Sequence, residues 1–419
     1  MLDRDAVDDL LAGVTRRGLA GIPETELLKE AYVEARRIGI PISRAIFIVD
    51  TLHPVYEGRL FRWRSETPDE MEVVDYERTN RPGTEGAERW LQSPFYRMFQ
   101  DGTERMRRRL VPEVLDEYAV LREMYDEGQT DWIALIDRFA PGSAIGELEC
   151  LFSSWTTDVP GGFEDEQLRA LKRLVPILGL ALKSASLARI AETLVETYLG
   201  RDAGRRVLAG RIERGVADRI EAALWFSDLR GYTRITGAAA PEHIIPFLND
   251  YAEVVVNAVH EAGGDVLKLI GDGTLAIFAG GSLAEACHCA LRAEKLVRRG
   301  IRELNRERAA GSLPTTEVYL GLHVGEVFYG NVGSQERLDF TVVGPAVNEA
   351  SRIAAMCRSA ERNVLASEAF VAAAADSDKP RLVSCGRFAL RGVEQPKELF
   401  TVAPPAMGLE APGELVPTG

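Results

Sequence analysis

The chain has 419 residues, of which 46% are hydrophobic and 27% are charged. This composition is typical of a soluble globular protein of two or three domains and excludes a disordered or fibrous chain. The formal net charge of −14 argues against nucleic acid or an anionic membrane as a partner that bulk charge attracts.

The ends and the cysteines carry little information on targeting or metal binding. The first residues, "MLDRDAVDDLLAGV", are acidic where a secretory signal is basic, and the longest apolar run, "LVPILGLAL" at 174–182, is too short to cross a bilayer. The five cysteines are scattered and lack zinc-site spacing, so we expect reduced and mostly buried thiols. We therefore predict a cytoplasmic protein.

Residues 1–163 are predicted to form an α+β domain with helices flanking an antiparallel sheet. A helical pattern, "ETELLKEAYVEARRIGI", precedes the strand-like runs "RAIFIVDTL", "RLFRWRS" and "EMEVVDYER". A second helical pattern near 113–127 is followed by "TDWIALIDRF" and "AIGELECLFSSWTT", which read as late strands.

Residues 164–204 are predicted to form a long helical linker. Apolar residues recur at a spacing of three and four from Leu168 to Leu182, and the pattern resumes with a shift of phase at Leu187. Pro176 predicts a kink or a break between two helices, and Gly200 a stop. The pattern fits equally an amphipathic helix packed on its own domain and a parallel coiled coil between two protomers.

Residues 205–403 show the succession strand, helix, two strands, helix, strand, which predicts a ferredoxin-like α+β domain. In that arrangement we expect helices on one face of the sheet and the other face free for a partner or a ligand. We also expect the two strands of the hairpin to flank the first strand. Residues 404–419 are rich in Pro and Gly and are predicted to be disordered.

Two aspartates mark the candidate site of this domain. Asp228 ends a strand in "LWFSDLRGYT", and Asp272 lies in the hairpin turn of "KLIGDG". Carboxylates that meet at one sheet edge repel each other unless a cation lies between them, and hard oxygen ligands suit Mg²⁺. A pair of such ions serves an in-line displacement at phosphorus. Taken singly, each Asp-Gly motif is also an ordinary turn.

Over residues 205–402 these motifs, together with "LDFTVVGPAVNEASR", resemble those of the class III nucleotide cyclases. The resemblance implies that Asp228 and Asp272 bind two Mg²⁺ or Mn²⁺ ions. It implies that Lys268 and Thr341 contact adenine, that Asn348 orients the ribose and that Arg352 stabilises charge on the phosphoryl group. Asn348 and Arg352 are four residues apart and share one face of a predicted helix.

The implied reaction is attack of the ribose 3′-oxygen of ATP on its α-phosphorus, which yields 3′,5′-cyclic AMP and pyrophosphate. In this family the site lies across a dimer interface, so the resemblance also implies a homodimer with two equivalent sites. Lys268 favours adenine, because guanine offers a carbonyl and an N–H where adenine offers an amine and a bare ring nitrogen. Thr341 resembles a bacterial subgroup, some members of which respond to bicarbonate.

Arg391, in "FALRGVEQPKELF", stands where many members of the family place a phosphate-binding lysine. The resemblance implies a contact between Arg391 and the substrate phosphates. An exposed arginine on a strand explains the residue equally well.

Residues 1–163 resemble a GAF-type sensor, most of all in "PGGFEDEQLRALKRL". This resemblance implies a regulatory domain with a small-molecule ligand whose identity the sequence does not give, and the linker helix as the route of the signal. A purely structural dimerisation domain is the alternative.

Three other functions compete with adenylate cyclase. A guanylate cyclase is disfavoured by Lys268. A diguanylate cyclase is disfavoured because Val266-Leu267 follow Gly264-Asp265 where Glu-Phe is expected. A catalytically silent nucleotide-binding regulator is expected to have lost a metal, ribose or phosphate residue, and this chain retains all of them.

Overall fold

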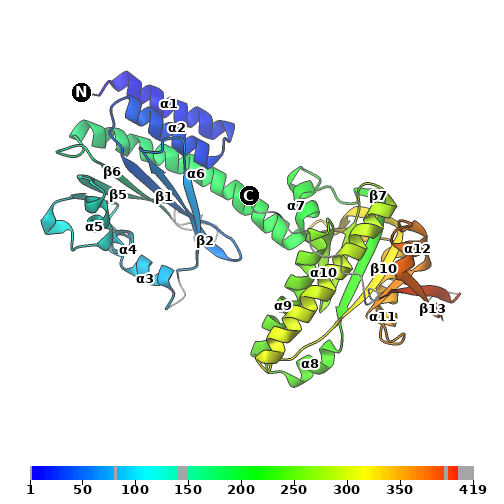
Figure 1. Ribbon diagram of the computed structural model, residues 1–419. Coiled ribbons are helices and arrows are strands. Elements are labelled where there is room, and N and C mark those ends of the chain that lie inside the picture. The colour runs from blue at the N-terminus through cyan, green and yellow to red at the C-terminus, as the bar shows by residue number, and fades with distance from the viewer. Residues whose placement is uncertain (1, 80–82, 140–149, 391–394, 404–419) are drawn as a thin grey trace, which may run out of the picture. The chain divides into compact units, whose positions relative to one another are not determined.

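The computed structural model describes residues 2–79, 83–139, 150–390 and 395–403. By its internal contacts the chain divides into two units, residues 1–194 and 195–419, and each unit is a mixed α+β structure (Figure 1). The predicted phosphate contact Arg391 and the predicted disordered tail 404–419 lie outside the described residues.

The first unit is built on a six-stranded sheet in the order β3-β2-β1-β6-β5-β4, with every neighbouring pair antiparallel. Its strands are β1 Arg44–Asp50, β2 Tyr56–Arg64, β3 Glu72–Glu77, β4 Arg105–Arg109, β5 Asp131–Arg138 and β6 Cys150–Thr157. Alternate side chains of the central strands enter two different apolar clusters, one on each face of the sheet.

Helices cover both faces of this sheet, as predicted (Figure 1). One face packs against α1 Arg4–Ala20, α2 Glu24–Arg37 and α6 Asp165–Leu199. The other carries α3 Glu85–Leu91, α4 Pro94–Gln100 and α5 Ala119–Asp126. The resemblance of this unit to a GAF-type sensor stays a prediction.

α6 is one continuous helix of 35 residues, so of the two alternatives predicted at Pro176, a kink or a break, the break is wrong. Pro176 is exposed, and the carbonyl that its ring leaves without a helical partner is therefore open to water. Leu174, Val175 and Leu178 beside it are fully buried in the core of the first unit, and this burial offsets the lost hydrogen bond. Up to Ile190 the helix packs on its own unit.

α6 is also long and apolar enough, by length and composition alone, to cross a membrane. The prediction that the apolar segment is too short for this therefore does not hold for the helix as a whole. Part of its apolar surface, including Leu171 and Leu182, lies in the core of the first unit, and 39% of its most apolar stretch is buried.

The second unit is built on an eight-stranded sheet in the order β13-β14-β12-β10-β7-β9-β8. The eighth strand, β11, pairs with the C-terminal part of β10, from Phe328 to Gly333. Only β10 and β12 run parallel among the pairs of described strands. The strands are β7 Ala217–Leu229, β8 Asp265–Ile270, β9 Gly273–Phe278, β10 Val318–Gly333, β11 Leu338–Val343, β12 Val364–Ser367, β13 Leu382–Phe388 and β14 Lys397–Val402. The predicted succession of strands and helices is confirmed.

Two details of this sheet differ from the prediction. The hairpin does not flank β7, because β9 pairs with β7 while β8 lies beyond β9. The second face is not free either. Residues of α7 Arg201–Leu208, β11 and α11 Pro345–Met356 pack on it in one apolar cluster with Leu224, Leu275 and Tyr329.

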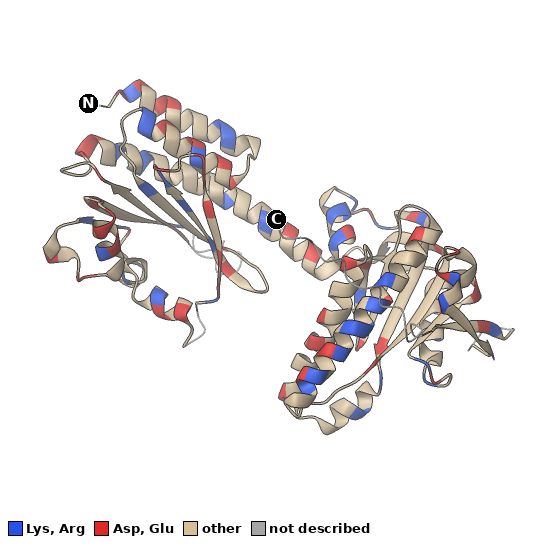
Figure 2. Cartoon of the chain, in the orientation of Figure 1, with Lys and Arg blue, Asp and Glu red and all other residues tan. Residues whose placement is uncertain are grey.

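The first face packs against the two long helices α9 Pro241–Glu261 and α10 Leu283–Ala310. The outer surface of α10 carries side chains of both charges (Figure 2). Two short helices, α8 Tyr232–Ala238 and α12 Glu368–Ala373, complete the unit. Three of the five cysteines, Cys150, Cys287 and Cys357, are buried, as expected.

Candidate active site

The carboxylates of Asp228 and Asp272 meet at one backbone amide. The N–H of Leu229 donates to Asp228 Oδ1 at 3.1 Å and to Asp272 Oδ2 at 3.3 Å. Asp228 is the last residue but one of β7, and Asp272 lies in the turn between β8 and β9. The predicted convergence of the two aspartates is therefore present within one chain.

Local glycines bring the hairpin turn this close to β7. Gly271 has a φ of 62°, a left-handed conformation that favours glycine in a two-residue turn. A Cβ atom on Gly273 would lie 2.9 Å from the carbonyl oxygen of Ser227 on β7. Glycine at 273 thus allows the close approach that places Asp272 beside Asp228.

Asp272 perturbs the carboxyl group of Asp228. Burial, the hydrogen bond with Asp272 and the negative charge of Asp272 together raise the pKa of Asp228 to about 7. A carboxyl group with this pKa is held partly protonated near neutral pH, because two adjacent negative charges are unfavourable without a cation.

The donor set fits divalent metal ions of the hard type. Two carboxylates supply oxygen ligands, and a cation between them would remove the repulsion that raises the pKa of Asp228. Among the described residues no group of three or more His, Cys, Asp or Glu side chains is placed to hold a metal. The remaining ligands would be water and substrate oxygens, as is usual for Mg²⁺ beside a triphosphate.

The pocket beside the two aspartates is small. It has a volume of about 170 Å³ and is lined also by Leu248, Leu269 and Val318. Pockets that enclose a small molecule usually span about 300–1,000 Å³. One protomer therefore does not enclose a nucleoside triphosphate at this point.

The predicted purine-binding residues form a second group on β8 and β11. Lys268 is exposed on β8, and its amine forms an ion pair with the carboxylate of Asp339 on β11. Thr341 lies two residues after Asp339 on β11, is 9% exposed and is paired with Gly330 of β10.

The remaining predicted residues, Asn348 and Arg352, lie on α11. Asn348 is exposed and Arg352 is half-buried. In the described part of the chain, no hydrogen bond or ion pair joins Asp228 or Asp272 to Lys268, Thr341, Asn348 or Arg352. One protomer thus presents the aspartate pair and the residues predicted to contact purine, ribose and phosphate as separate groups.

Sequence reasoning missed Asp339. The residue precedes Thr341 by two positions in a strand, so both side chains point to the same face of β11. The sequence did offer one indication, namely an acidic residue two positions before Thr341, which is predicted to contact the base. Its partner Lys268 lies 71 residues earlier, and only the fold brings the two together.

Apolar side chains surround these groups without cover from their own chain. Leu269 and Ile270 of β8, Phe328 of β10 and Val343 of β11 are 57%, 46%, 49% and 39% exposed. Large exposed apolar side chains that gather beside polar site residues mark an interaction surface.

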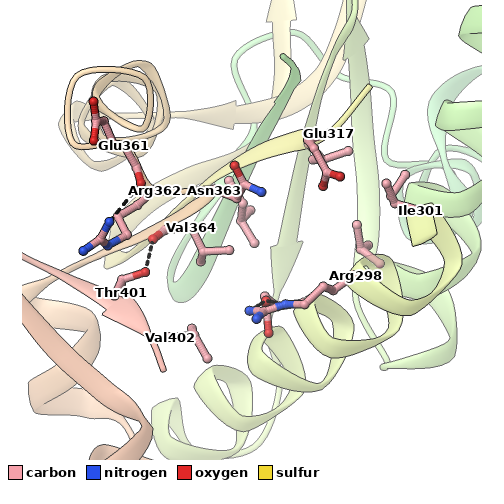
Figure 3. A pocket seen from close by; sticks show the side chains of 13 residues that line it. Arg298, Ile301, Glu317, Glu361, Arg362, Asn363, Val364, Thr401 and Val402 are labelled. Atoms are coloured by element: carbon pink, nitrogen blue, oxygen red, sulfur yellow. Dashed lines mark hydrogen bonds and ion pairs between the residues drawn. The ribbon is translucent and has the colours of Figure 1, made fainter. Parts of the chain in front are cut away.

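Another pocket of the second unit, about 360 Å³ in volume, lies between α10, β10, β12 and β14 (Figure 3). Arg298 points into it and pairs with the buried carboxylate of Glu294, and the Thr401 hydroxyl donates to the Val364 carbonyl at 2.8 Å. None of the predicted site residues lines it, and we assign it no part in the chemistry.

Comparison with known proteins finds similarity over the second unit of the chain. Residues 217–403 match the family described as the adenylate and guanylate cyclase catalytic domain. An adenylate cyclase of Anabaena cylindrica is 39% identical over 164 residues, which cover 38% of this chain and 32% of that protein. An uncharacterized protein of Mycobacterium tuberculosis is 32% identical over 210 residues, 49% of this chain and 38% of its own length.

The chain thus spans about a third of the length of these curated relatives. Among solved structures, the adenylyl cyclase CyaB from P. aeruginosa matches with a TM-score of 0.42 and 24% identity, covering 46% of this chain and 99% of that one.

Proposed function

We propose that the protein is an adenylate cyclase, in line with the match of residues 217–403 to the adenylate and guanylate cyclase catalytic domain. It converts ATP to 3′,5′-cyclic AMP and pyrophosphate at sites shared between two copies of the chain. The single observation that carries the proposal is the convergence of Asp228 and Asp272 on the Leu229 amide.

Asp228 and Asp272 hold two divalent cations, Mg²⁺ or Mn²⁺, in this proposal. Such ions, when bound, lower the pKa of the attacking 3′-hydroxyl and neutralise the triphosphate. Arg352 donates to the oxygens of the α-phosphoryl group, where a planar guanidinium matches the charge that develops. Asn348, one turn earlier on α11, orients the ribose so that its 3′-oxygen faces the phosphorus.

Lys268 and Thr341 select the base. The Lys268 amine donates to the bare ring nitrogen of adenine, and the Thr341 hydroxyl meets the exocyclic amine. Asp339 keeps the Lys268 amine over β11, where Thr341 also lies, and so positions it for the base. Arg391 is proposed to contact the phosphates.

Two observations support a homodimer. The aspartates and the base-binding residues are separate groups in one protomer, and exposed apolar side chains of β8, β10 and β11 lie beside them. A second copy that covers these side chains brings the aspartates of one chain to the base, ribose and phosphate residues of the other.

The rest of the proposal concerns regulation. We assign residues 1–163 to a regulatory domain, 164–204 to a signalling helix and 205–403 to the catalytic domain, in a cytoplasmic protein. A ligand that binds the regulatory domain differently in the active and inactive dimers alters turnover through the helix.

The test is a product assay on the purified full-length protein with ATP or GTP and with Mg²⁺ or Mn²⁺. We expect cyclic AMP from the wild type and from Glu303→Ala, which removes an exposed carboxylate of α10, and none from Asp272→Ala. Cyclic GMP as the main product would make the protein a guanylate cyclase. No product from a dimeric protein under any of these conditions would contradict the proposal.

Base selection has its own test. Lys268→Glu replaces a donor with an acceptor, so the ratio of kcat/KM for ATP to that for GTP is expected to fall at least about tenfold. An unchanged ratio would remove Lys268 from base recognition and leave the cyclase reaction itself untouched.

A further inference from the structure

A pocket of about 930 Å³ lies in the first unit, between its sheet and helices α3 and α4. It is on the face opposite α1, α2 and α6 and contains none of the proposed catalytic residues. Its volume is in the range of pockets that enclose a small molecule.

The floor of the pocket is one continuous row of apolar side chains across four strands. Val74 of β3 is paired with Leu60 of β2, Leu60 with Ile48 of β1, and Ile48 with Phe152 of β6. All four line the pocket, and Val74 is 40% exposed. Directly paired residues share one face of a sheet, so the row offers a flat apolar surface.

Aromatic side chains form the wall above this floor. Trp90 of α3 and Phe99 of α4 both pack against Phe152, with ring centroids 5.4 and 6.3 Å apart. Tyr96 of α4 packs edge-on against Trp90 at 5.9 Å. Trp90, Tyr96 and Phe99 are half-buried and line the pocket, so part of each ring borders the space that a ligand would fill.

The next row of the sheet is polar. Gly58 of β2 stands between Tyr76 and Asp50, and the Tyr76 hydroxyl donates to Asp50 Oδ1 at 2.7 Å. A Cβ atom on Gly58 would collide with the Tyr76 ring. Glycine at 58 therefore lets Tyr76 lie across the strand and present its ring and the Asp50 carboxylate at one end of the pocket.

Among the described residues that line the pocket, acidic groups outnumber basic ones. Its lining includes the carboxylates of Asp50, Glu57, Glu77 and Glu85 and the guanidinium groups of Arg78 and Arg89. Glu85 and Arg89 form an exposed ion pair with each other at 2.6 Å. Glu57 accepts hydrogen bonds from the backbone and the hydroxyl of Thr79, which fix its position. The described side chains that line the pocket therefore carry more negative than positive charges.

We propose that this pocket binds a small organic cation with a flat apolar body. The apolar floor and the aromatic wall bury the body, and a positive group is attracted by the carboxylates and by the faces of Trp90, Tyr76 and Tyr96. This binding uses residues of the first unit alone, so it can be measured in the absence of nucleotide and of the cyclase reaction.

The test uses two fluorescent probes with the same aromatic group, dansylcadaverine, which carries an ammonium group, and dansylglycine, which carries a carboxylate. Each is titrated with full-length protein in the absence of nucleotide, and binding is followed by dansyl anisotropy. We expect dansylcadaverine to bind at least about fivefold more tightly than dansylglycine.

Three variants locate the binding. Leu60→Trp fills the floor and should abolish binding of dansylcadaverine. Glu57→Gln removes the charge and keeps one of the two acceptor oxygens that Thr79 uses, and it should weaken binding of dansylcadaverine at least about fivefold while leaving that of dansylglycine unchanged or tighter. Glu72→Gln makes the same change on β3 outside the pocket lining and should have no effect. A melting curve for each variant checks that the first unit is folded.

The proposal is overturned if neither probe binds, if dansylglycine binds more tightly, or if Leu60→Trp folds and leaves binding unchanged. A protein that binds the cation but makes no cyclic nucleotide would refute the proposed function alone. A protein that makes cyclic AMP but binds neither probe would refute only the proposal of a cation-binding pocket.

Discussion

At the scale of single residues, the amide of Leu229 is where the two proposed metal ligands meet. Asp228 and Asp272 both accept a hydrogen bond from it, and one weak donor does not compensate two negative charges. The protein without metal is therefore strained at this point above neutral pH. A divalent cation between the two carboxylates would remove this repulsion. The repulsion in the metal-free protein would therefore favour binding of the cation.

This repulsion predicts opposite effects of Asp272→Asn on activity and on stability. Without its neighbour's charge, Asp228 loses one of the causes that raise its pKa to about 7. An acid whose pKa is raised by folding costs stability as the pH rises from its unfolded value to its folded value. In EDTA the melting temperature of Asp272→Asn should thus equal that of wild type at pH 4 and exceed it at pH 8.

In the same variant Mn²⁺ should no longer raise the melting temperature, and kcat should fall at least about a hundredfold. Glu303→Ala is the control for both measurements. A variant that keeps the rise in melting temperature with Mn²⁺ would show that the metal binds elsewhere.

Asp339 is the second residue with a defined task, because its carboxylate pairs with Lys268. The pair is exposed and adds little to stability, so its proposed role is the position of the amine. Asp339→Asn should raise KM for ATP about three- to tenfold, with a smaller change in kcat, and lower the preference for ATP over GTP.

The matched control is Glu336→Gln, an exposed acid three residues earlier in the turn before β11. It should leave KM and base preference as in wild type. Equal effects of the two substitutions would reduce the role of Asp339 to its contribution to surface charge.

At the scale of elements, the β8–β9 hairpin carries both kinds of site residue. Lys268 lies on β8 and Asp272 lies in the turn, so a shift of the hairpin relative to β7 moves a base contact and a metal ligand together. Gly273 sets this position, since nothing larger than hydrogen fits between it and the carbonyl of Ser227.

Gly273→Ala is predicted to separate the turn from β7. The resulting shift should cost about 1–3 kcal/mol of stability and abolish most of the metal-dependent activity. Gly237→Ala in α8 is the control, because no atom lies within 4 Å of the added Cβ. It should change neither stability nor activity. Full activity of a stable Gly273→Ala protein would show that the hairpin tolerates displacement.

The sequence predicted elements best where periodicity is long and unbroken. The strands from β1 to β3 and the helices α9 and α10 follow from alternation and from three-four spacing. The continuity of α6 through Pro176 could not be predicted from the sequence. It depends on the burial of Leu174 and Leu178 against residues that are remote in sequence. α1 was missed for a different reason. Its apolar residues Val7, Leu10, Leu11 and Val14 have the three-four spacing of a helix face, but its acidic first residues were used only as evidence against a secretory signal.

At the scale of the whole molecule, sequence motifs identified the residues of the proposed site but not their grouping. The meeting of Asp228 and Asp272 was predicted from the order of the strands, although that order was wrong in detail. The pairing of Lys268 with Asp339 and the packing of α11 on the second face depend on how β11 folds back on β10. No short sequence pattern predicts the antiparallel pairing of β11 with β10.

The separation of the site into two groups makes the complete protein a reciprocal dimer in this account. Asp272→Ala damages only the aspartate side of each site, and Arg352→Ala only the phosphate side. In a mixed dimer of the two variants, one site carries both defects and the other carries none.

The most direct measurement is therefore cyclic AMP formation by the two inactive variants, first apart and then co-expressed or mixed after subunit exchange. We predict negligible product from each alone and, at equal amounts, about a quarter of the wild-type rate from the mixture, because half of the dimers are mixed and each has one intact site. No recovery in a sample shown to contain mixed dimers would contradict a site shared between two chains.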